Sequence, residues 1–277
     1  MKISEYRNTI LPLVKPQIAL NTYTSYRLAF DKWIQLMGDT ELDAVTTQQV
    51  ELFKNKALQK LTASAVSIYF RAIKSLLNRG IQMGLVTENP FLKAKAVKIP
   101  HTPPDFLDDL EQALLLSKVK GQGKKKTESL RRLYVFLFNT GLRSGEALNL
   151  KVDDVDLKNR TIRVYASKTN TVRGVPLNIK ALEAVTIEIN GRTNGKIWTV
   201  TINGASNAFR RALLSAGITK NVSFYSTRHS FASNLVKKNV DISKVSRLMG
   251  HSTTALTSRY YLHLQTDTLA DAVSALD

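Results

Sequence analysis

A proline-containing stretch, AKAVKIPHTPP at residues 94–104, is the feature that most constrains how this chain can fold. Its three prolines disfavour helix and strand alike, because proline fixes its own backbone angle and lacks the N–H that both kinds of hydrogen-bond ladder need. The apolar pattern before this stretch is helical, whereas the pattern after it mixes helical and strand periodicities. We therefore predict two domains, residues 1–95 and residues 105–277, joined by a linker at residues 96–104.

Apolar residues in the first domain recur at helical spacing. Residues 21–38 place aromatic and aliphatic side chains on one stripe and end at a glycine, and residues 46–59 begin at threonines that can cap a helix. Residues 62–84 are strongly apolar on one face. A turn at residues 88–90, Glu-Asn-Pro, closes the unit. The first domain is predicted to be helical.

The second domain mixes two periodicities. Residues 106–120 and 129–150 are predicted helices, whereas residues 160–167 and 172–178 alternate as paired strands do. The pattern from about residue 178 onward is helical again, with breaks expected at glycines 191, 195, 204, 217 and 250. We predict a mainly α fold with a small antiparallel β-sheet, in which the second domain is α+β.

Charge indicates the class of partner. The chain carries 40 Lys plus Arg against 22 Asp plus Glu, a net charge of +18. Residues 1–99 contribute 14 basic and 7 acidic side chains and residues 100–277 contribute 26 and 15, so both domains are basic. Such an excess favours nucleic acid as the partner. Without a signal pattern or an apolar run of about 20 residues, we expect a cytoplasmic, nucleoid-associated protein and no membrane contact.

Two runs of charged residues can be interpreted as ordinary surface structure. GQGKKK, residues 121–126, is predicted to be a loop, either a solvated one or one that contacts phosphate. VDDVD, residues 152–156, is the dense acidic cluster that metal-dependent cleavage would need, and we interpret it instead as a polar turn leading into a strand. The chain has no cysteine, which excludes disulfides and thiolate metal sites. We expect no metal and no other cofactor.

Without a metal, the charge of a phosphoryl transition state must be neutralised by Arg, Lys or His, and a covalent route needs a nucleophile such as tyrosine. Arg143 follows Gly141 where a helix restarts, Ser144 is expected to cap that helix, and Glu146 lies within reach of the arginine. Arg228 begins another helix. A guanidinium can hold two phosphate oxygens at once. Taken singly, each arginine is more typical of a surface ion pair.

The motifs become informative in combination. GLRSGEAL, a lysine between two strands, TRHSFASNL and MGHSTTALTSRY follow one another in this order. This arrangement resembles the tyrosine recombinase, or phage integrase, family, and the resemblance covers most of the chain. It implies a helical core-binding domain at residues 1–95 and a catalytic domain at residues 105–277, with a C-terminal tail helix. Any one of these short motifs is weak evidence, but four in order are specific.

The resemblance assigns roles residue by residue. It implies a first catalytic arginine at Arg143 with Glu146 as its acidic companion, a turn lysine at Lys168, a second arginine at Arg228, His251 at the histidine or tryptophan position, and Tyr260 as nucleophile. Tyr261 falls one position late. Adjacent helical side chains point about 100° apart, so both tyrosines cannot aim at one phosphate. We expect Tyr261 to pack or to form a hydrogen bond nearby.

One position departs from the family pattern. Three residues before the second arginine the family usually has a histidine, and here it is Tyr225. A phenol donates a hydrogen bond but is a poor proton shuttle near neutral pH. We expect activity to survive, because both arginines and Lys168 remain. His229 directly follows Arg228 and is interpreted as a buried structural histidine.

The implied reaction needs neither ATP nor metal. Arg143, Arg228 and His251 hold the non-bridging oxygens of a DNA phosphate, Tyr260 attacks phosphorus, and Lys168 protonates the leaving 5′-oxygen. The product is a 3′-phosphotyrosyl link that a second strand can displace. The chain is therefore expected to be a site-specific recombinase of a mobile genetic element.

The family also implies an assembly. Four protomers, monomeric without DNA, act on double-stranded DNA through a Holliday junction, in some cases with accessory DNA-bending proteins. Residues 267–277 are predicted to form a small amphipathic helix that docks on a neighbour or folds back in cis. The alternatives are relaxation of DNA by a type IB topoisomerase-like activity, or a catalytically impaired DNA-binding protein of the same fold.

Overall fold

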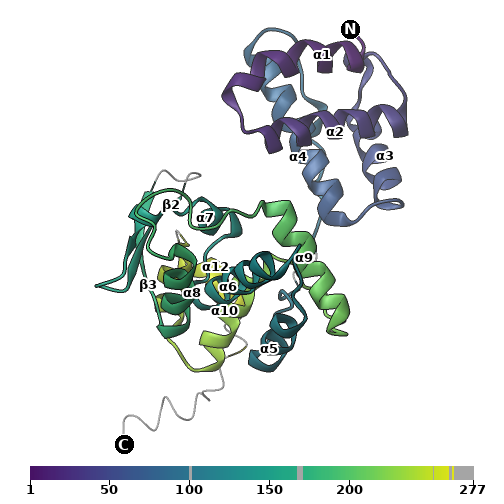
Figure 1. Ribbon diagram of the computed structural model, residues 1–277. Coiled ribbons are helices and arrows are strands. Elements are labelled where there is room, and N and C mark those ends of the chain that lie inside the picture. Colours follow the sequence, from purple (N-terminus) through teal and green to yellow (C-terminus); the bar gives the residue numbers. More distant parts are fainter. Residues whose placement is uncertain (100–101, 167–170, 252, 262–263, 265–277) are drawn as a thin grey trace, which may run out of the picture. The chain divides into compact units, whose positions relative to one another are not determined.

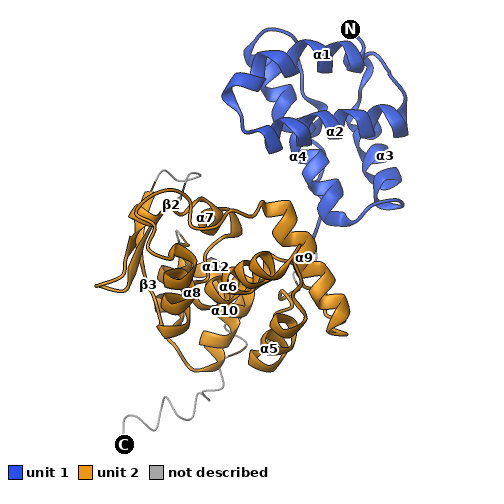
Figure 2. Ribbon diagram, viewed as in Figure 1, with its two compact units in different colours: residues 1–101 blue, residues 102–277 orange. Residues whose placement is uncertain are grey.

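The computed structural model describes residues 1–99, 102–166, 171–251, 253–261 and 264. The chain divides into two compact units, residues 1–101 and residues 102–277 (Figure 2). Lys95 belongs to the first unit, because its backbone N–H donates to Glu51 and its carbonyl accepts from Lys54. Asp105 belongs to the second, since its carboxylate accepts from the N–H of Asn221. Lys168 and the predicted tail helix at residues 267–277 lie outside the described residues.

Unit 1 is helical (Figure 1). Its α-helices are α1 (Ile3–Val14), α2 (Leu20–Met37), α3 (Thr47–Leu58) and α4 (Ala63–Gln82), with short 3-10 turns η1 (Lys15–Gln17), η2 (Leu42–Ala44) and η3 (Pro90–Leu92). The three helices predicted from periodicity are present as α2, α3 and α4. Thr46 caps α3 by accepting from the N–H of Gln49, and Thr62 caps α4 in the same way.

The core of unit 1 is aromatic. Trp33 packs against Phe53 and Phe91, with ring centroids 4.8 and 5.6 Å apart, which holds α2 against α3 and η3. Tyr6 of α1 is buried and donates a 2.7 Å hydrogen bond to the carbonyl of Leu76 in α4. A Cβ at position 80 would lie 2.2 Å from the Tyr6 hydroxyl, so the glycine inside α4 is what lets α1 pack there. Helix α1 was not predicted; Pro12 interrupts its pattern.

Unit 2 has a larger hydrophobic core than unit 1, and Figure 1 shows its helices and its small sheet. Its helices are α5 (Asp109–Lys118), α6 (Lys124–Thr140), α7 (Ser144–Asn149), α8 (Ile179–Ile189), α9 (Ile202–Ser215), α10 (Ser226–Lys237), α11 (Ile242–Met249) and α12 (Thr254–Tyr261). A 3-10 turn, η4 (Val152–Asp154), leads into the strands β1 (Val155–Asp156), β2 (Thr161–Ala166) and β3 (Thr171–Pro176). The strands form one antiparallel sheet in the order β1-β2-β3. The predicted fold class, mainly α with a small antiparallel sheet, is confirmed.

Three local predictions were wrong. The lysines of GQGKKK form the first turn of α6 rather than a loop, because Gly123 caps that helix at a φ of +84° and Lys124 starts it. Gly204 does not break a helix, since its N–H donates to the capping hydroxyl of Thr201 in the first turn of α9. The third error, the helix cap predicted at Ser144, is described with the active site.

The acidic run at residues 152–156 is the turn and strand that we expected. None of the helices within the described residues is long and apolar enough to span a membrane.

Candidate active site

The corner between α6 and α7 presents Arg143. Gly141 ends α6 in the left-handed conformation, with a φ of +64°, and a Cβ there would lie 2.2 Å from Phe231 on α10. Glycine is therefore required both for the turn and for the close packing on α10. Arg143 is the N-cap residue of α7 and Ser144 is its first helical residue, so the predicted cap at Ser144 was wrong. The Arg143 side chain remains 40% exposed.

Glu146 ties this corner to the sheet. Its carboxylate accepts hydrogen bonds from the Arg143 guanidinium at 2.9 Å and from the Arg143 backbone N–H at 3.1 Å. Arg173 of β3 donates to both carboxylate oxygens, at 2.8 and 3.3 Å. Burial works to raise the pKa of Glu146, but the hydrogen bonds and charge of Arg173, and then those of Arg143, outweigh it and lower the pKa. Glu146 is therefore ionised at neutral pH. The predicted contact between Arg143 and Glu146 is confirmed.

Arg228 occupies the centre of the site. Arg228 is 1% exposed, which excludes a surface ion pair, the role that the arginine alone would suggest. One terminal nitrogen donates to the carbonyl of Gly141 at 2.8 Å and the other to the carbonyl of Met249 at 2.6 Å. The side chain thus joins the end of α6 to the end of α11. Burial, and then the charge of Arg143, lower the pKa of Arg228 to about 10, so it stays charged at neutral pH.

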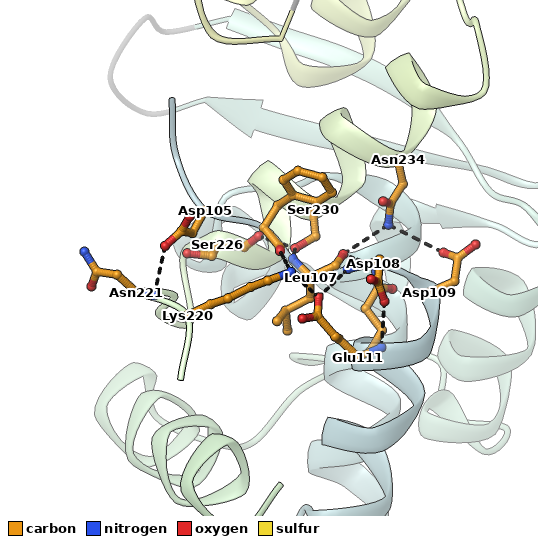
Figure 3. A network of polar contacts seen from close by, with 12 residues as sticks. Asp105, Leu107, Asp108, Asp109, Glu111, Lys220, Asn221, Ser226, Ser230 and Asn234 are labelled. Atoms are coloured by element: carbon orange, nitrogen blue, oxygen red, sulfur yellow. Dashed lines mark hydrogen bonds and ion pairs between the residues drawn. The ribbon is translucent and has the colours of Figure 1, made fainter. Parts of the chain in front are cut away.

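Residues at the start of unit 2 brace the helix that carries Arg228 (Figure 3). Leu107 donates its N–H to the hydroxyl of Ser230 at 2.9 Å, and its carbonyl accepts from the side-chain amide of Asn234 at 3.2 Å. Lys220 extends the network by pairing with Glu111. Since Ser230 and Asn234 lie on α10, this network fixes that helix from the side that carries residues 105–111.

The turn between α11 and α12 presents His251. Gly250 ends α11 in the left-handed conformation, with a φ of +64°. The His251 ring is partly buried, and its Nδ1 is hydrogen-bonded to the hydroxyl of buried Thr257 at 2.7 Å. Burial, followed by the charges of Arg228 and Arg143, lowers the pKa of His251 to about 4. The ring is thus neutral at pH 7, and when Nδ1 accepts from Thr257 its Nε2 carries a proton that it can donate.

The two adjacent tyrosines of α12 have different surroundings. Tyr261 is 1% exposed and its hydroxyl is hydrogen-bonded to Nδ1 of His229 on α10. Burial raises the pKa of Tyr261. Tyr260 is partly buried and packs against a small cluster formed by Tyr261 and residues of α10 and α11. The prediction that Tyr261 packs or forms a hydrogen bond is confirmed, and this pairing makes Tyr261 a structural tyrosine.

His229 and Tyr225 flank this tyrosine pair. His229 is partly buried, and burial followed by the charge of Arg228 lowers its pKa to about 4. It is a neutral structural histidine at pH 7. Tyr225, immediately before α10, is 46% exposed and meets the His229 ring edge-on with centroids 5.3 Å apart. Its phenol is accessible from solvent at the edge of the site.

Five of the seven predicted site residues lie around one positively charged centre: Arg143, Glu146, Tyr225, Arg228 and His251. Tyr260 lies on α12, which packs against α10 and α11, and Lys168 lies outside the described residues. Among the described residues, no three His, Asp or Glu side chains converge as metal ligands do.

The sequence interpretation missed Arg173. Strand β3 places every second side chain on one face, so Arg173 faces the same way as buried Val175. That alternation was the available signal.

Comparisons with known proteins agree with this geometry. The sequence profile described as the phage integrase family matches residues 106–267. A tyrosine recombinase of Thermosipho africanus is 30% identical over 271 residues, which cover 92% of this chain and 93% of that protein. Tyrosine recombinase XerC of Halalkalibacterium halodurans is 30% identical over 231 residues, covering 77% and 75%. Among solved structures, a lambda integrase tetramer bound to a Holliday junction has a similar fold, with a TM-score of 0.78, 18% identity and coverage of 94% of this chain and 77% of that one.

Proposed function

The chain belongs to the phage integrase family and is a site-specific tyrosine recombinase, and on that premise we propose that it cuts and rejoins double-stranded DNA through Tyr260. The family and the enzyme class are those that the motifs indicated. One observation carries the proposal: the buried Arg228 side chain joins Gly141, two residues before Arg143, to Met249, two residues before His251. A single guanidinium therefore sets the spacing of the groups that would surround a phosphate.

Phosphate binding is the first step. Arg143, with its exposed guanidinium, and His251, with a proton on Nε2, would each donate to a non-bridging oxygen. Arg228 uses two of its five N–H groups on backbone carbonyls, and its Nε has no partner among the described atoms. Because Arg228 is almost fully covered without DNA, its contact with the phosphate requires its cover to open in the bound form. The phosphate takes the place of water at the charged centre.

Strand cleavage is the second step. The Tyr260 hydroxyl gives its proton to water as its oxygen bonds to phosphorus, the bond from phosphorus to the 5′-oxygen breaks, and Lys168 supplies the proton to that oxygen. The two arginines stabilise the pentavalent transition state. The phosphodiester energy is kept in the 3′-phosphotyrosyl bond, so a 5′-hydroxyl of another strand can reverse the reaction. Tyr225 would donate a hydrogen bond to the phosphate from the edge of the site.

The two units divide the work. Unit 2 contains the whole family match, and we assign catalysis to it. Unit 1 would act as the core-binding domain. The net charge of +18 favours binding of DNA by both units. By analogy with the lambda integrase tetramer on a Holliday junction, we propose that four copies act on two DNA segments. Residues 267–277, which lie outside the described residues, would dock on a neighbouring copy or fold back in cis. We also propose that accessory DNA-bending proteins assist and that the protein acts at the nucleoid.

The test is covalent trapping. The protein is incubated with a pool of duplexes that carry a nick and a randomised centre, so that the short 5′-hydroxyl strand released by cleavage diffuses away and rejoining is prevented. Complexes that resist denaturing detergent are recovered and their DNA is sequenced. We expect wild-type protein and Tyr261→Phe to be trapped on one class of sequence and Tyr260→Phe to be absent from the recovered complexes.

The same experiment separates the alternatives. Binding of the pool with no covalent product from wild-type protein would indicate a catalytically impaired DNA-binding protein. Trapping on many unrelated sequences, together with relaxation of a supercoiled plasmid by the monomer, would indicate a topoisomerase-like activity. Trapping on one sequence class with exchange of strands between two such duplexes supports recombination.

A further inference from the structure

Arg173 contacts the proposed site at two places but has no part in the reaction described above. Its guanidinium holds both oxygens of Glu146, the residue that also binds Arg143. Its side chain is 17% exposed, compared with 40% for Arg143. Arg173 is therefore mostly covered by the protein, while Arg143 is the more exposed of the two arginine side chains that share the carboxylate.

The second contact is with the turn before His251. A Cβ at Gly250 would lie 2.8 to 3.0 Å from three atoms of the Arg173 side chain, Nε, Cζ and Cδ. The Arg173 guanidinium thus lies directly against the Gly250 backbone. Its Nε is buried without a hydrogen-bond partner among the described atoms. A buried cationic donor left in this state is costly, so its retention calls for a gain elsewhere.

The way in which Arg173 and Arg143 share the two oxygens of Glu146 shows what that gain is. One oxygen accepts from Arg173 at 2.8 Å and from the Arg143 backbone, and the other accepts from the Arg143 guanidinium at 2.9 Å and from Arg173 at 3.3 Å. Arg143 therefore gives this carboxylate a single side-chain hydrogen bond, through one of its two terminal nitrogens. If a neutral residue replaced Arg173, Arg143 would be the charged partner left to the buried Glu146 carboxylate. A bidentate ion pair between Arg143 and Glu146 would then be favoured.

Resting on the function proposed above, we propose that Arg173 is a positioning residue for strand cleavage: by neutralising Glu146 and packing on Gly250, it keeps the Arg143 guanidinium free for the scissile phosphate. Arg173 does not touch the DNA. Its effect passes through Glu146 to Arg143 and through Gly250 to the backbone of His251. The strand that bears it, β3, is held in register by its pairing with β2, where Arg173 is opposite Val164. The guanidinium is thereby supplied from a rigid element.

The test is a double-mutant cycle with four proteins: wild type, Arg173→Gln, Glu146→Gln and the double variant. Each is assayed for single-turnover formation of the covalent complex, at saturating protein, on a nicked duplex recovered from the trapping experiment. Affinity for that duplex and thermal stability are measured alongside. Arg163→Gln is the matched control, since Arg163 is an exposed arginine on the neighbouring strand that donates to a backbone carbonyl.

We expect Arg173→Gln to lower the cleavage rate about 10- to 100-fold, with affinity for the duplex changed less than about threefold. Removing the unbalanced carboxylate should restore part of that loss, so the double variant should cleave several-fold faster than Arg173→Gln. Arg173→Lys keeps the charge and should lose less than Arg173→Gln. Arg163→Gln should match wild type.

A merely structural role predicts another pattern. If the double variant cleaves more slowly than Arg173→Gln, or if Arg173→Gln reduces affinity and leaves the saturated rate unchanged, the positioning role is wrong. If Arg173→Gln fails to fold, the cycle is run with Arg173→Lys alone and combined with Glu146→Gln, and a combined variant slower than Arg173→Lys by the full effect of Glu146→Gln has the same meaning. Failure of wild-type protein to form any covalent complex would overturn the proposed function and this role together, whereas normal trapping with additive losses overturns this role alone.

Discussion

The guanidinium of Arg228 donates a 2.8 Å hydrogen bond to the backbone carbonyl of Gly141, which lies 87 residues earlier in the chain. Gly141 is the left-handed residue that ends α6 and precedes the corner with Arg143. A side chain proposed to act on DNA is therefore also part of the framework of the site. Stability and catalysis are coupled at this residue, and they can be separated by experiment.

Arg228→Ala should destabilise the protein even without DNA. It leaves the carbonyls of Gly141 and Met249 without this donor in a buried setting, for which we expect a loss of about 2–5 kcal/mol in the free energy of unfolding. Urea denaturation measures it. The control is Arg210→Ala, an exposed position on α9 where a change within about 0.5 kcal/mol is expected. Equal stability of the two variants would contradict the framework role.

Tyr261→Phe should affect stability and leave cleavage in place. It keeps the buried ring and removes the hydroxyl that is bonded to His229, so we expect about 1 kcal/mol of destabilisation. Covalent trapping should stay within about threefold of wild type, because the hydroxyl is engaged in the protein interior. Denaturation and trapping are measured on the same preparation. Loss of trapping in Tyr261→Phe at normal stability would reverse the assignment of the two tyrosines.

Acid should destabilise the DNA-free protein through two histidines. His229 and His251 have pKa values lowered to about 4, against 6.5 for an unperturbed histidine. Between pH 6.5 and 4 the unfolded chain therefore binds more protons than the folded one, and stability is present above pH 6.5 and is lost as the pH falls toward 4. Allowing for partial exposure of both rings, we expect about 1–2 kcal/mol for each.

This pH dependence can be assigned by substitution. Urea denaturation at pH 7.5 and pH 5.0 should show a smaller difference in His251→Gln and in His229→Gln than in wild type. A pH dependence that neither substitution reduces would place its origin in other groups.

Lys168 can be tested as the general acid independently of its position in the structure. Lys168→Ala should lower cleavage about 10²- to 10⁴-fold on an ordinary phosphodiester. Replacing the leaving 5′-oxygen by sulfur removes the need for a proton donor, so on that substrate the variant should cleave at close to the wild-type rate. Lys158→Ala, an exposed lysine in the turn before β2, is the control. An equal defect on both substrates would exclude a proton-donor role.

The places of Arg143 and His251 at helix ends could be predicted because they follow local signals. Gly141 and Gly250 mark helix ends, Arg143 comes two residues after Gly141, and His251 comes directly after Gly250. The helices of unit 1 followed from apolar periodicity, except for α1, where Pro12 interrupts the pattern. Gly204 misled the prediction because the first turn of a helix tolerates glycine when a threonine caps it. These errors are local and leave the fold class unchanged.

What the sequence could not predict depends on long-range contacts. Arg228 looked like a surface arginine because burial of a guanidinium is decided by two carbonyls, at positions 141 and 249, that no local pattern connects to it. The role of Arg173 was missed for the same reason, since its partner Glu146 lies 27 residues away. The alternation in β3 indicates which way Arg173 faces but not which residues it contacts there.

The central claim is that the Tyr260 oxygen becomes joined to a 3′-phosphate of DNA, and peptide mapping tests it most directly. The covalent complex recovered from the nicked pool is digested with nuclease and protease, and the peptide that carries the residual nucleotide is fragmented in a mass spectrometer. We predict that the added mass lies on Tyr260 in every modified peptide. Added mass on Tyr261 or on a residue of another kind, or a recovered complex with no modified peptide, would contradict it.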